Sequence, residues 1–214
     1  MREAKIRSRW YWVWCVVAGW GLCGSAMSGA GEVISLGGRL EPFVDTFLLE
    51  SMDNAEPRLQ TPIEREIVFS FDQPWEGPSS AYCTVLRDGD AYRLYYRGYC
   101  PADLDDQQVT CMAESADGIH FTRPGLGLYE FNGSKDNNIV WQGKEAHNFA
   151  PFLDTRPQCP PHEKWKALAG LPPVAFVSED GIHWRKKQEE PVITEGAFDS
   201  QNIAFWDAEA GYYR

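Results

Sequence analysis

The chain has 214 residues, with 31 Asp and Glu against 20 Lys and Arg, and a formal net charge of −11 at pH 7. A surface of that sign repels phosphate backbones and anionic lipid, so nucleic acid and membrane surfaces are disfavoured as main partners and a neutral ligand is favoured. Solubility alone is the other explanation for such a charge.

Residues 1–30 have the three parts of a secretory signal. Basic residues among the first nine precede an apolar stretch over 10–22, and small residues then offer a cleavage site after Ala30, with Ala26 as the second choice. The apolar stretch is shorter than the ~20 residues that span a bilayer. We predict a signal peptide at 1–30 and a mature part at 31–214 that is secreted or periplasmic and no longer membrane-bound after cleavage.

Residues 33–75 precede the first repeated unit, and within them residues 43–49 (Phe-Val-Asp-Thr-Phe-Leu-Leu) are a candidate strand that caps or closes the fold. Further along the chain, Cys100 and Cys111 flank one predicted hairpin loop. In an oxidising compartment a disulfide between them is one possibility, and packed free thiols are the other.

An internal repeat organises the rest of the chain. Residues 115–121 read Ser-Ala-Asp-Gly-Ile-His-Phe and residues 178–184 read Ser-Glu-Asp-Gly-Ile-His-Trp, a displacement of 63 positions. Asp-Gly predicts a tight turn in which the Ser and Asp side chains bond the turn's own amides. We therefore interpret His120 and His183 as architectural and not catalytic.

Strand patterns recur at matching positions around these turns. Each unit reads as strand, Asp-containing turn, aromatic-rich strand, loop, strand, Asp-Gly turn and strand. The predicted strand pairs span 81–87 with 92–99, 147–153 with 165–169, and 203–206 with 212–214. Long helices are not predicted anywhere.

Each unit matches one antiparallel four-stranded blade, which predicts an all-β fold, a β-propeller. Two blades are complete, and a third has begun when the sequence ends at Arg214. Since a propeller must close to protect its strand edges, we expect a longer protein with about two and a half further blades.

Five motifs between residues 40 and 214 point to a known family. They are S-x-D-G-x-x-W at 178–184, Phe-Val-Asp-x-Phe-Leu at 43–48, Gly-Ser-Lys-Asp-Asn-Asn at 133–138, Phe-Asp-Ser-Gln-Asn at 198–202 and Phe-Trp-Asp at 205–207. In these motifs the chain resembles the exported branch of the five-bladed β-propeller glycoside hydrolases, the superfamily of arabinanases, invertases and levanases (families 32 and 43).

The resemblance implies a funnel-shaped site on the propeller axis that acts on poly- or oligosaccharides. One carboxylate serves there as nucleophile or base and another as acid, on either side of the glycosidic bond. An acid stands shortly before the first strand of each unit, so the candidate catalytic residues are Glu76, Glu145 and Asp199.

Neighbouring polar and aromatic side chains are the candidate sugar contacts, because amides and imidazoles bond hydroxyl groups and aromatic rings stack on sugar faces. These candidates are Trp75, His147, Asn148, Gln201 and Asn202. The cysteine spacing fits no zinc pattern, and neither a metal nor a cofactor is expected.

Two alternatives to hydrolysis remain open. The chain lacks the Trp-Met-Asn-Asp-Pro, Arg-Asp-Pro and Glu-Cys signatures of the invertase group, which favours a non-catalytic carbohydrate-binding propeller. The Asp-Gly turns also resemble those of sialidases, but a sialidase-like site needs an arginine triad, and arginine is scarce near the predicted strand starts.

Overall fold

The structure is a computed structural model, and it describes residues 34–38, 40–78, 80–98 and 107–214. The predicted signal at 1–30 lies outside the described residues. The chain divides into two units, Met1–Pro62 and Ile63–Arg214. In the described part of the chain, no helix is long and apolar enough to cross a membrane.

The described residues of the first unit form turns and extended chain without a strand. Where the sequence predicted a strand at 43–49, a turn forms: Asp45 accepts the amide of Phe47 at 2.9 Å, and Leu49 donates to Thr46 at 3.0 Å. The strand prediction is wrong because an Asp side chain that bonds a nearby amide offers the backbone an alternative to a ladder.

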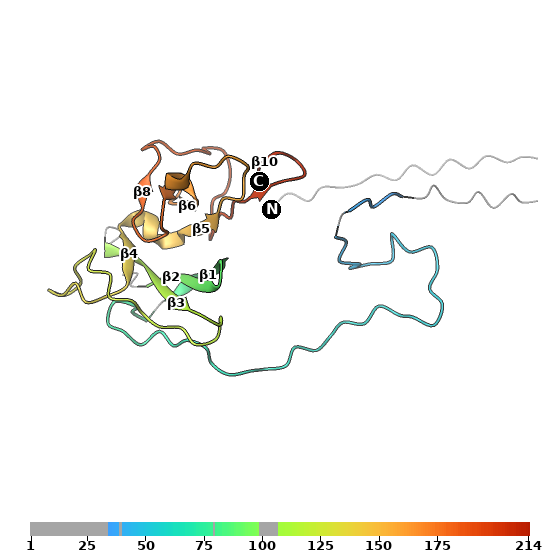
Figure 1. The fold of residues 1–214 in the computed structure, drawn as a ribbon, viewed down its shortest axis with the longest axis horizontal. Coiled ribbons are helices and arrows are strands. Elements are labelled where there is room, and N and C mark those ends of the chain that lie inside the picture. Colours follow the sequence, from blue (N-terminus) through green and yellow to red (C-terminus); the bar gives the residue numbers. More distant parts are fainter. Residues whose placement is uncertain (1–33, 39, 79, 99–106) are drawn as a thin grey trace, which may run out of the picture. The chain divides into compact units, whose positions relative to one another are not determined.

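The second unit contains two four-stranded antiparallel sheets and a short hairpin (Figure 1). The first sheet has β1 (Ala81–Asp88), β2 (Ala91–Arg97), β3 (Val109–Ser115) and β4 (Ile139–Gln142), in that order. The second has β5 (Ala150–Leu153), β6 (Trp165–Ala169), β7 (Val174–Ser178) and β8 (Arg185–Lys186). The hairpin pairs β9 (Trp206–Asp207) with β10 (Tyr212–Tyr213).

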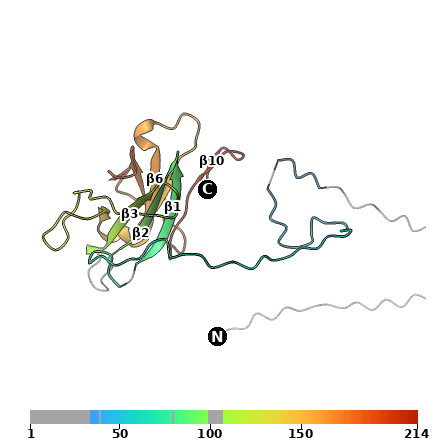
Figure 2. The same cartoon turned by 60° about the horizontal axis from the view of Figure 1, so that its bottom comes forward.

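The described residues are thus all-β with antiparallel sheets, and their helices are short 3₁₀ turns at Lys144–Asn148 (η2) and Pro161–Glu163 (η3). The predicted pair of four-stranded sheets is confirmed, and in the second sheet the Asp-Gly turn joins the last two strands as predicted. In the first sheet the turn leads instead to a single bridge between Glu114 and Thr122, and β4 follows only at Ile139. β1 contacts β5, and Figure 2 shows the strands of the two sheets side by side.

The two Asp-Gly turns have the same hydrogen bonds. In the first, the Ser115 hydroxyl accepts the amide of Gly118 at 2.9 Å, and Asp117 accepts the amide of His120 at 2.8 Å. The second turn repeats both bonds at the same distances. Local side-chain acceptors therefore satisfy the turn's backbone donors, as the sequence predicted.

Both histidines of the repeat belong to these turns. The Nδ1 atoms of His120 and His183 lie 2.7 Å from the carboxylates of Asp117 and Asp180, respectively. The hydrogen bond to Asp117 raises the pKa of His120. The same bond, together with backbone amides, holds the pKa of Asp117 well below its usual value. These contacts agree with an architectural role for the two histidines.

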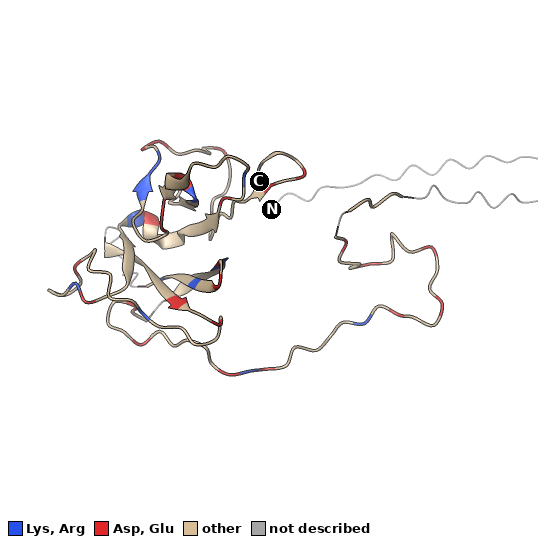
Figure 3. Ribbon diagram, viewed as in Figure 1, with Lys and Arg blue, Asp and Glu red and all other residues tan. Residues whose placement is uncertain are grey.

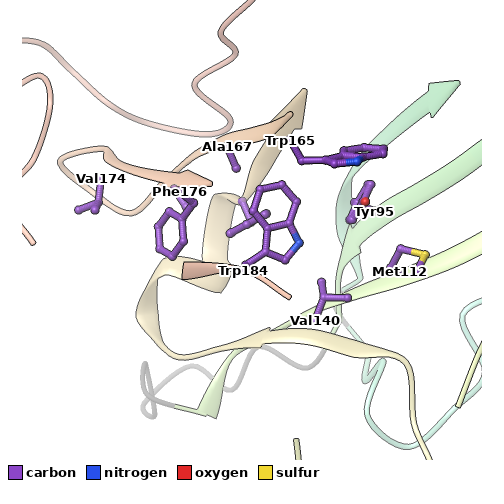
Figure 4. Packing of buried hydrophobic residues seen from close by; sticks show 10 residues of the cluster. Tyr95, Met112, Val140, Trp165, Ala167, Val174, Phe176 and Trp184 are labelled. Atoms are coloured by element: carbon purple, nitrogen blue, oxygen red, sulfur yellow. The ribbon is translucent and has the colours of Figure 1, made fainter. Parts of the chain in front are cut away.

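The main core fills the space between the two sheets (Figure 4). Tyr95 and Met112 come from the first sheet, and Trp165 and Phe176 come from the second. Alternate residues of β2 and β6 point into this core because successive side chains of a strand face opposite ways. A second cluster covers the opposite face of the first sheet.

Cys111 belongs to this second cluster, and its thiol is free and fully buried. Burial raises the pKa of the Cys111 thiol well above its usual value, which keeps it protonated. Cys100 lies outside the described residues. Within the described part, the structure shows Cys111 as a packed free thiol, which is the second of the two alternatives.

The second Asp-Gly turn is also a contact between the sheets. The hydroxyl of Tyr95 donates to the carbonyl of Gly181 at 2.9 Å, and the Arg93 guanidinium donates to the carbonyl of Asp180. Arg93 also lies 4.7 Å above the ring of Trp165. A motif that looks local in the sequence therefore docks one sheet on the other.

Asp154 joins the second sheet to the β9–β10 hairpin. Its buried carboxylate accepts the ammonium of Lys166 at 2.6 Å and the hydroxyl of Tyr213 at 2.6 Å. Burial opposes ionisation, but these bonds outweigh it and hold the pKa of Asp154 well below its usual value. The register of the sheets places Asp88 at the equivalent position of β1, where it pairs with Lys164 at 2.7 Å.

We expect Asp154→Asn to destabilise the chain at pH 7 by about 1.5–3 kcal/mol, the usual worth of hydrogen bonds to a charged group. A carboxylate whose pKa is lowered by folding stabilises the folded chain at pH values above the pKa of the unfolded state, ~3.9. This contribution is lost as the pH falls toward the lower pKa of the folded state. Urea unfolding between pH 3 and 7 should therefore show a smaller loss of stability on acidification in the variant. Asp88→Asn, the matched and more exposed control, should cost less than about 1 kcal/mol. Equal effects of the two substitutions would contradict a clamp at Asp154.

Candidate functional site

Four of the predicted site residues, Glu145, His147, Asn148 and Gln201, lie at one end of the sheets, which we call the proximal end: the end where β1 and β5 begin. Gln201 shows that the two strand starts meet there, because its Nε2 donates to the carbonyls of Tyr82 at 3.0 Å and Phe149 at 3.2 Å. Antiparallel pairing brings the ends of β2 and β6 to the same place. The Asp-Gly turns lie at the opposite, distal end.

A pocket of about 450 Å³ opens at the proximal end. Its walls come from η2, from the β6–β7 turn and from β8, both of whose residues are basic (Figure 3). The lining residues with most bearing on its chemistry are Gln108, Glu145, His147, Gly170, Val174 and Lys186. With Lys144 and Glu189, which also line it, the pocket combines two carboxylates, an imidazole, an amide and two ammonium groups.

Glu145 lies on η2, and its side chain is buried. The Lys186 ammonium is 3.0 Å from its carboxylate. Burial opposes ionisation, but the bond to Lys186, the residue's own backbone amide and the Lys186 charge hold the pKa of Glu145 below its usual value. At neutral pH the group is an anion, which suits a hydrogen-bond acceptor, base or nucleophile and not a proton donor.

His147 lines the same pocket, two residues further along η2. Its Nδ1 lies 2.9 Å from the side-chain oxygen of Gln108, and its Nε2 lies 3.4 Å from the guanidinium of Arg97. Arg97 in turn lies 4.7 Å over the ring of Tyr82. Tyr82 has φ +54 at a bulge in β1, a backbone conformation that bulky residues rarely adopt.

Asn148 and Gln201 tie the proximal end together. Asn148 accepts the amide of Gly170 at 2.8 Å and donates to the carbonyl of Ser200 at 2.9 Å. Gln201 bridges the starts of β1 and β5 as described above. The structure therefore brings Asn148, Gln201 and His147, all predicted sugar contacts, into one region. The side-chain amides of Asn148 and Gln201 are already engaged in hydrogen bonds that join segments of the chain.

Asp199 and Asn202 lie on the segment that leads to β9. Asp199 is exposed, and its carboxylate accepts the amide of Ser200 at 2.9 Å. Asn202 and Gln201 line a different, more apolar cavity of about 640 Å³ on the face of the second sheet that carries Phe152 and Val177. Neither Asp199 nor Asn202 lines the Glu145 pocket.

Glu76 and Trp75 lie on the outer face of the first sheet. The Glu76 carboxylate accepts Arg123 at 2.8 and 2.9 Å, the hydroxyl of Tyr96 at 2.5 Å and the amide of Gln73 at 2.8 Å. The indole of Trp75 donates to Asn138 at 2.6 Å. The structure does not bring these two predicted residues to the proximal pocket.

Sequence reasoning missed Gln108, Arg97 and Lys186 in and beside the pocket. One signal was available for Lys186, since it stands 63 positions after Arg123, the same displacement as the heptads. In the part of the chain that the structure describes, no group of three or more His, Cys, Asp or Glu side chains is arranged to hold a metal ion.

Comparisons of the chain with protein-family models, with curated proteins and with solved structures find no match. The geometry of the proximal pocket is therefore the basis for the function proposed below.

Proposed function

We propose that this chain belongs to an exported propeller-type protein that binds poly- or oligosaccharides in the proximal pocket. The observation that carries the proposal is the pairing of Glu145 and His147 on one 3₁₀ turn, facing a 450 Å³ pocket with Gln108 beside them. Carboxylate, imidazole and amide groups are the side chains that bond sugar hydroxyls. The signal-like pattern at 1–30 supports export, and the repeated sheets support blades of a five-bladed propeller.

Glycoside hydrolysis is the second candidate, and the ionised state of Glu145 favours it. A hydrolase needs two carboxyl groups on either side of the scissile bond, about 5–5.5 Å apart in retaining enzymes and 6.5–9.5 Å apart in inverting ones. Of the three predicted acids, Glu145 alone lines the pocket. A second carboxylate, Glu189, also lines the pocket and shares the Lys186 ammonium with Glu145, so Glu189 and the predicted Asp199 are the candidates for a second acid. Because Glu189 is largely exposed and Asp199 lies outside the pocket, sugar binding without hydrolysis is the simpler proposal.

Binding of neutral oligosaccharides, measured by calorimetry, tests the proposal. We expect Glu145→Gln to weaken binding about tenfold or more, since hydrogen bonds to a charged acceptor are worth ~1.5–3 kcal/mol. Glu179→Gln, an exposed acid beside the distal turn, is the control and should leave the affinity unchanged. Release of reducing ends that disappears in Glu189→Gln or in Asp199→Asn would favour hydrolysis. No binding by the unmodified chain to any oligosaccharide of the panel would refute the proposal.

A further inference from the structure

The ion pair of Glu145 and Lys186 has a counterpart in the first repeat. Glu76 and Glu145 each stand five residues ahead of the strand that begins their sheet. Arg123 and Lys186 each stand five residues after the Gly of their Asp-Gly turn. The same acid–cation pair therefore occurs twice, Glu76 with Arg123 and Glu145 with Lys186.

The backbone agrees with this equivalence. Thr122 bridges Glu114, and Arg185 pairs with Val177, so each cation follows the residue that pairs with the end of the third strand. The members of these two pairs are again 63 positions apart. The two cations consequently occupy the same place in their sheets.

The first pair is sealed inside the protein. Glu76 is 0% exposed, and three of its donors come from the two nitrogens of Arg123 and the hydroxyl of Tyr96. Together with the amide of Gln73, they match the four acceptor sites of a carboxylate. This pair has a structural role.

In the second pair Glu145 is also buried, but the pair borders the proximal pocket, and one large side chain is missing beside it. Tyr96 pairs with Cys111, and Ala169 pairs with Val174, which stands 63 positions after Cys111. Ala169 therefore takes the place of Tyr96, and neither a phenol ring nor its hydroxyl reaches Glu145. The neighbours of Ala169 in this register, Gly170 and Val174, line the proximal pocket.

The cation also differs between the pairs. Arg123 presents a fork of two donors to Glu76, whereas Lys186 presents one ammonium that it shares between Glu145 at 3.0 Å and Glu189 at 3.2 Å. A planar fork takes up both oxygens of a carboxylate, and an ammonium acts as a point charge. Lys186 thus holds Glu145 in position but occupies fewer of its acceptor sites than Arg123 occupies on Glu76.

We infer that Ala169 and Lys186 convert the structural acid–cation pair of the repeat into a ligand-facing one, so that Glu145, and not Glu76, is the carboxylate that meets a ligand. Lys186 is a positioning residue, and Ala169 is the residue whose small size admits the ligand. The identification of that ligand as a sugar rests on the proposed function, but the opening of the pair does not.

Carboxyl labelling with a water-soluble carbodiimide and glycine ethyl ester, read by mass spectrometry, tests the opening without any sugar. In the folded chain we expect Glu145 to be labelled several-fold faster than Glu76. Ala169→Tyr should protect Glu145, because the phenol fills the space and donates to the carboxylate. Conversely, Tyr96→Ala removes the phenol from Glu76 and should increase the labelling of that acid. Equal labelling of the two acids, or no response of Glu145 to Ala169→Tyr, would overturn the inference.

Lys186→Met and Lys186→Arg test the positioning and do not depend on whether Ala169→Tyr folds. A carbon-13 NMR titration should show a higher pKa of Glu145 in Lys186→Met and its recovery in Lys186→Arg. An unchanged pKa in Lys186→Met would exclude positioning by Lys186. If the labelling follows expectation but no oligosaccharide binds, the proposed function fails and the inference stands. If sugars bind equally well in Ala169→Tyr with the fold intact, the inference fails.

Discussion

Gly181→Ala is expected to destabilise the chain by about 3 kcal/mol or more. Gly181 has φ +74, and a left-handed backbone costs roughly 1–2 kcal/mol in a residue with a Cβ. The added Cβ would also lie 2.5 Å from Arg93, 2.6 Å from the Tyr95 hydroxyl and 2.9 Å from Trp165. Overpacking of this kind adds typically 1–3 kcal/mol.

Gly118→Ala is the matched control for this prediction. Gly118 occupies the same position of the first Asp-Gly turn and has φ +77, but its added Cβ meets nothing nearer than Tyr92 at 3.4 Å. We expect a cost of about 1–2 kcal/mol from the backbone alone. Chemical denaturation of both variants measures the difference, and equal losses would mean that the docking of the second turn on the first sheet adds no stability.

Arg123→Met is expected to cost about 3–5 kcal/mol, because it leaves the buried carboxylate of Glu76 without its charged partner. The double variant Glu76→Met with Arg123→Met should recover much of this loss, since replacing both members of a buried pair with apolar residues is often neutral. Lys186→Met should cost less than Arg123→Met because Lys186 gives its acid one ammonium where Arg123 gives two nitrogens, and because its pair borders the pocket.

Unfolding by urea, followed by tryptophan fluorescence, distinguishes these outcomes for the two pairs. A double variant as unstable as Arg123→Met alone would show that the loss comes from packing and not from the unpaired charge. A cost of Lys186→Met equal to that of Arg123→Met would argue that both pairs are sealed, against the geometry of the proximal pocket.

The features that the sequence predicted well are those with a local physical cause. The Asp-Gly turns follow from side-chain acceptors within three residues of the amides that they satisfy. The strand pairs around Asp88 and Asp154 follow from residue alternation and turn chemistry, and the structure places both acids at the end of the first strand of their sheets. The 63-residue displacement then predicts a repeated sheet.

Local signals were not sufficient where a strand needs a partner. Residues 43–49 have strand-like composition but form a turn, and the predicted strand at 203–206 is reduced to Trp206–Asp207. Strand formation depends on hydrogen bonds to another segment, which composition does not report.

The candidate site divides in the same way. The sequence by itself determined that an acid precedes the first strand of each unit, because the repeat fixes its position. Only the tertiary structure decided that Glu76 is enclosed by Arg123 and Tyr96 whereas Glu145 borders a pocket. The physical reason is that the exposure of a carboxylate depends on the side chains that pack beside it in the folded protein. Tyr96 bonds Glu76 in the first repeat, whereas Ala169 stands at the position of Tyr96 in the second.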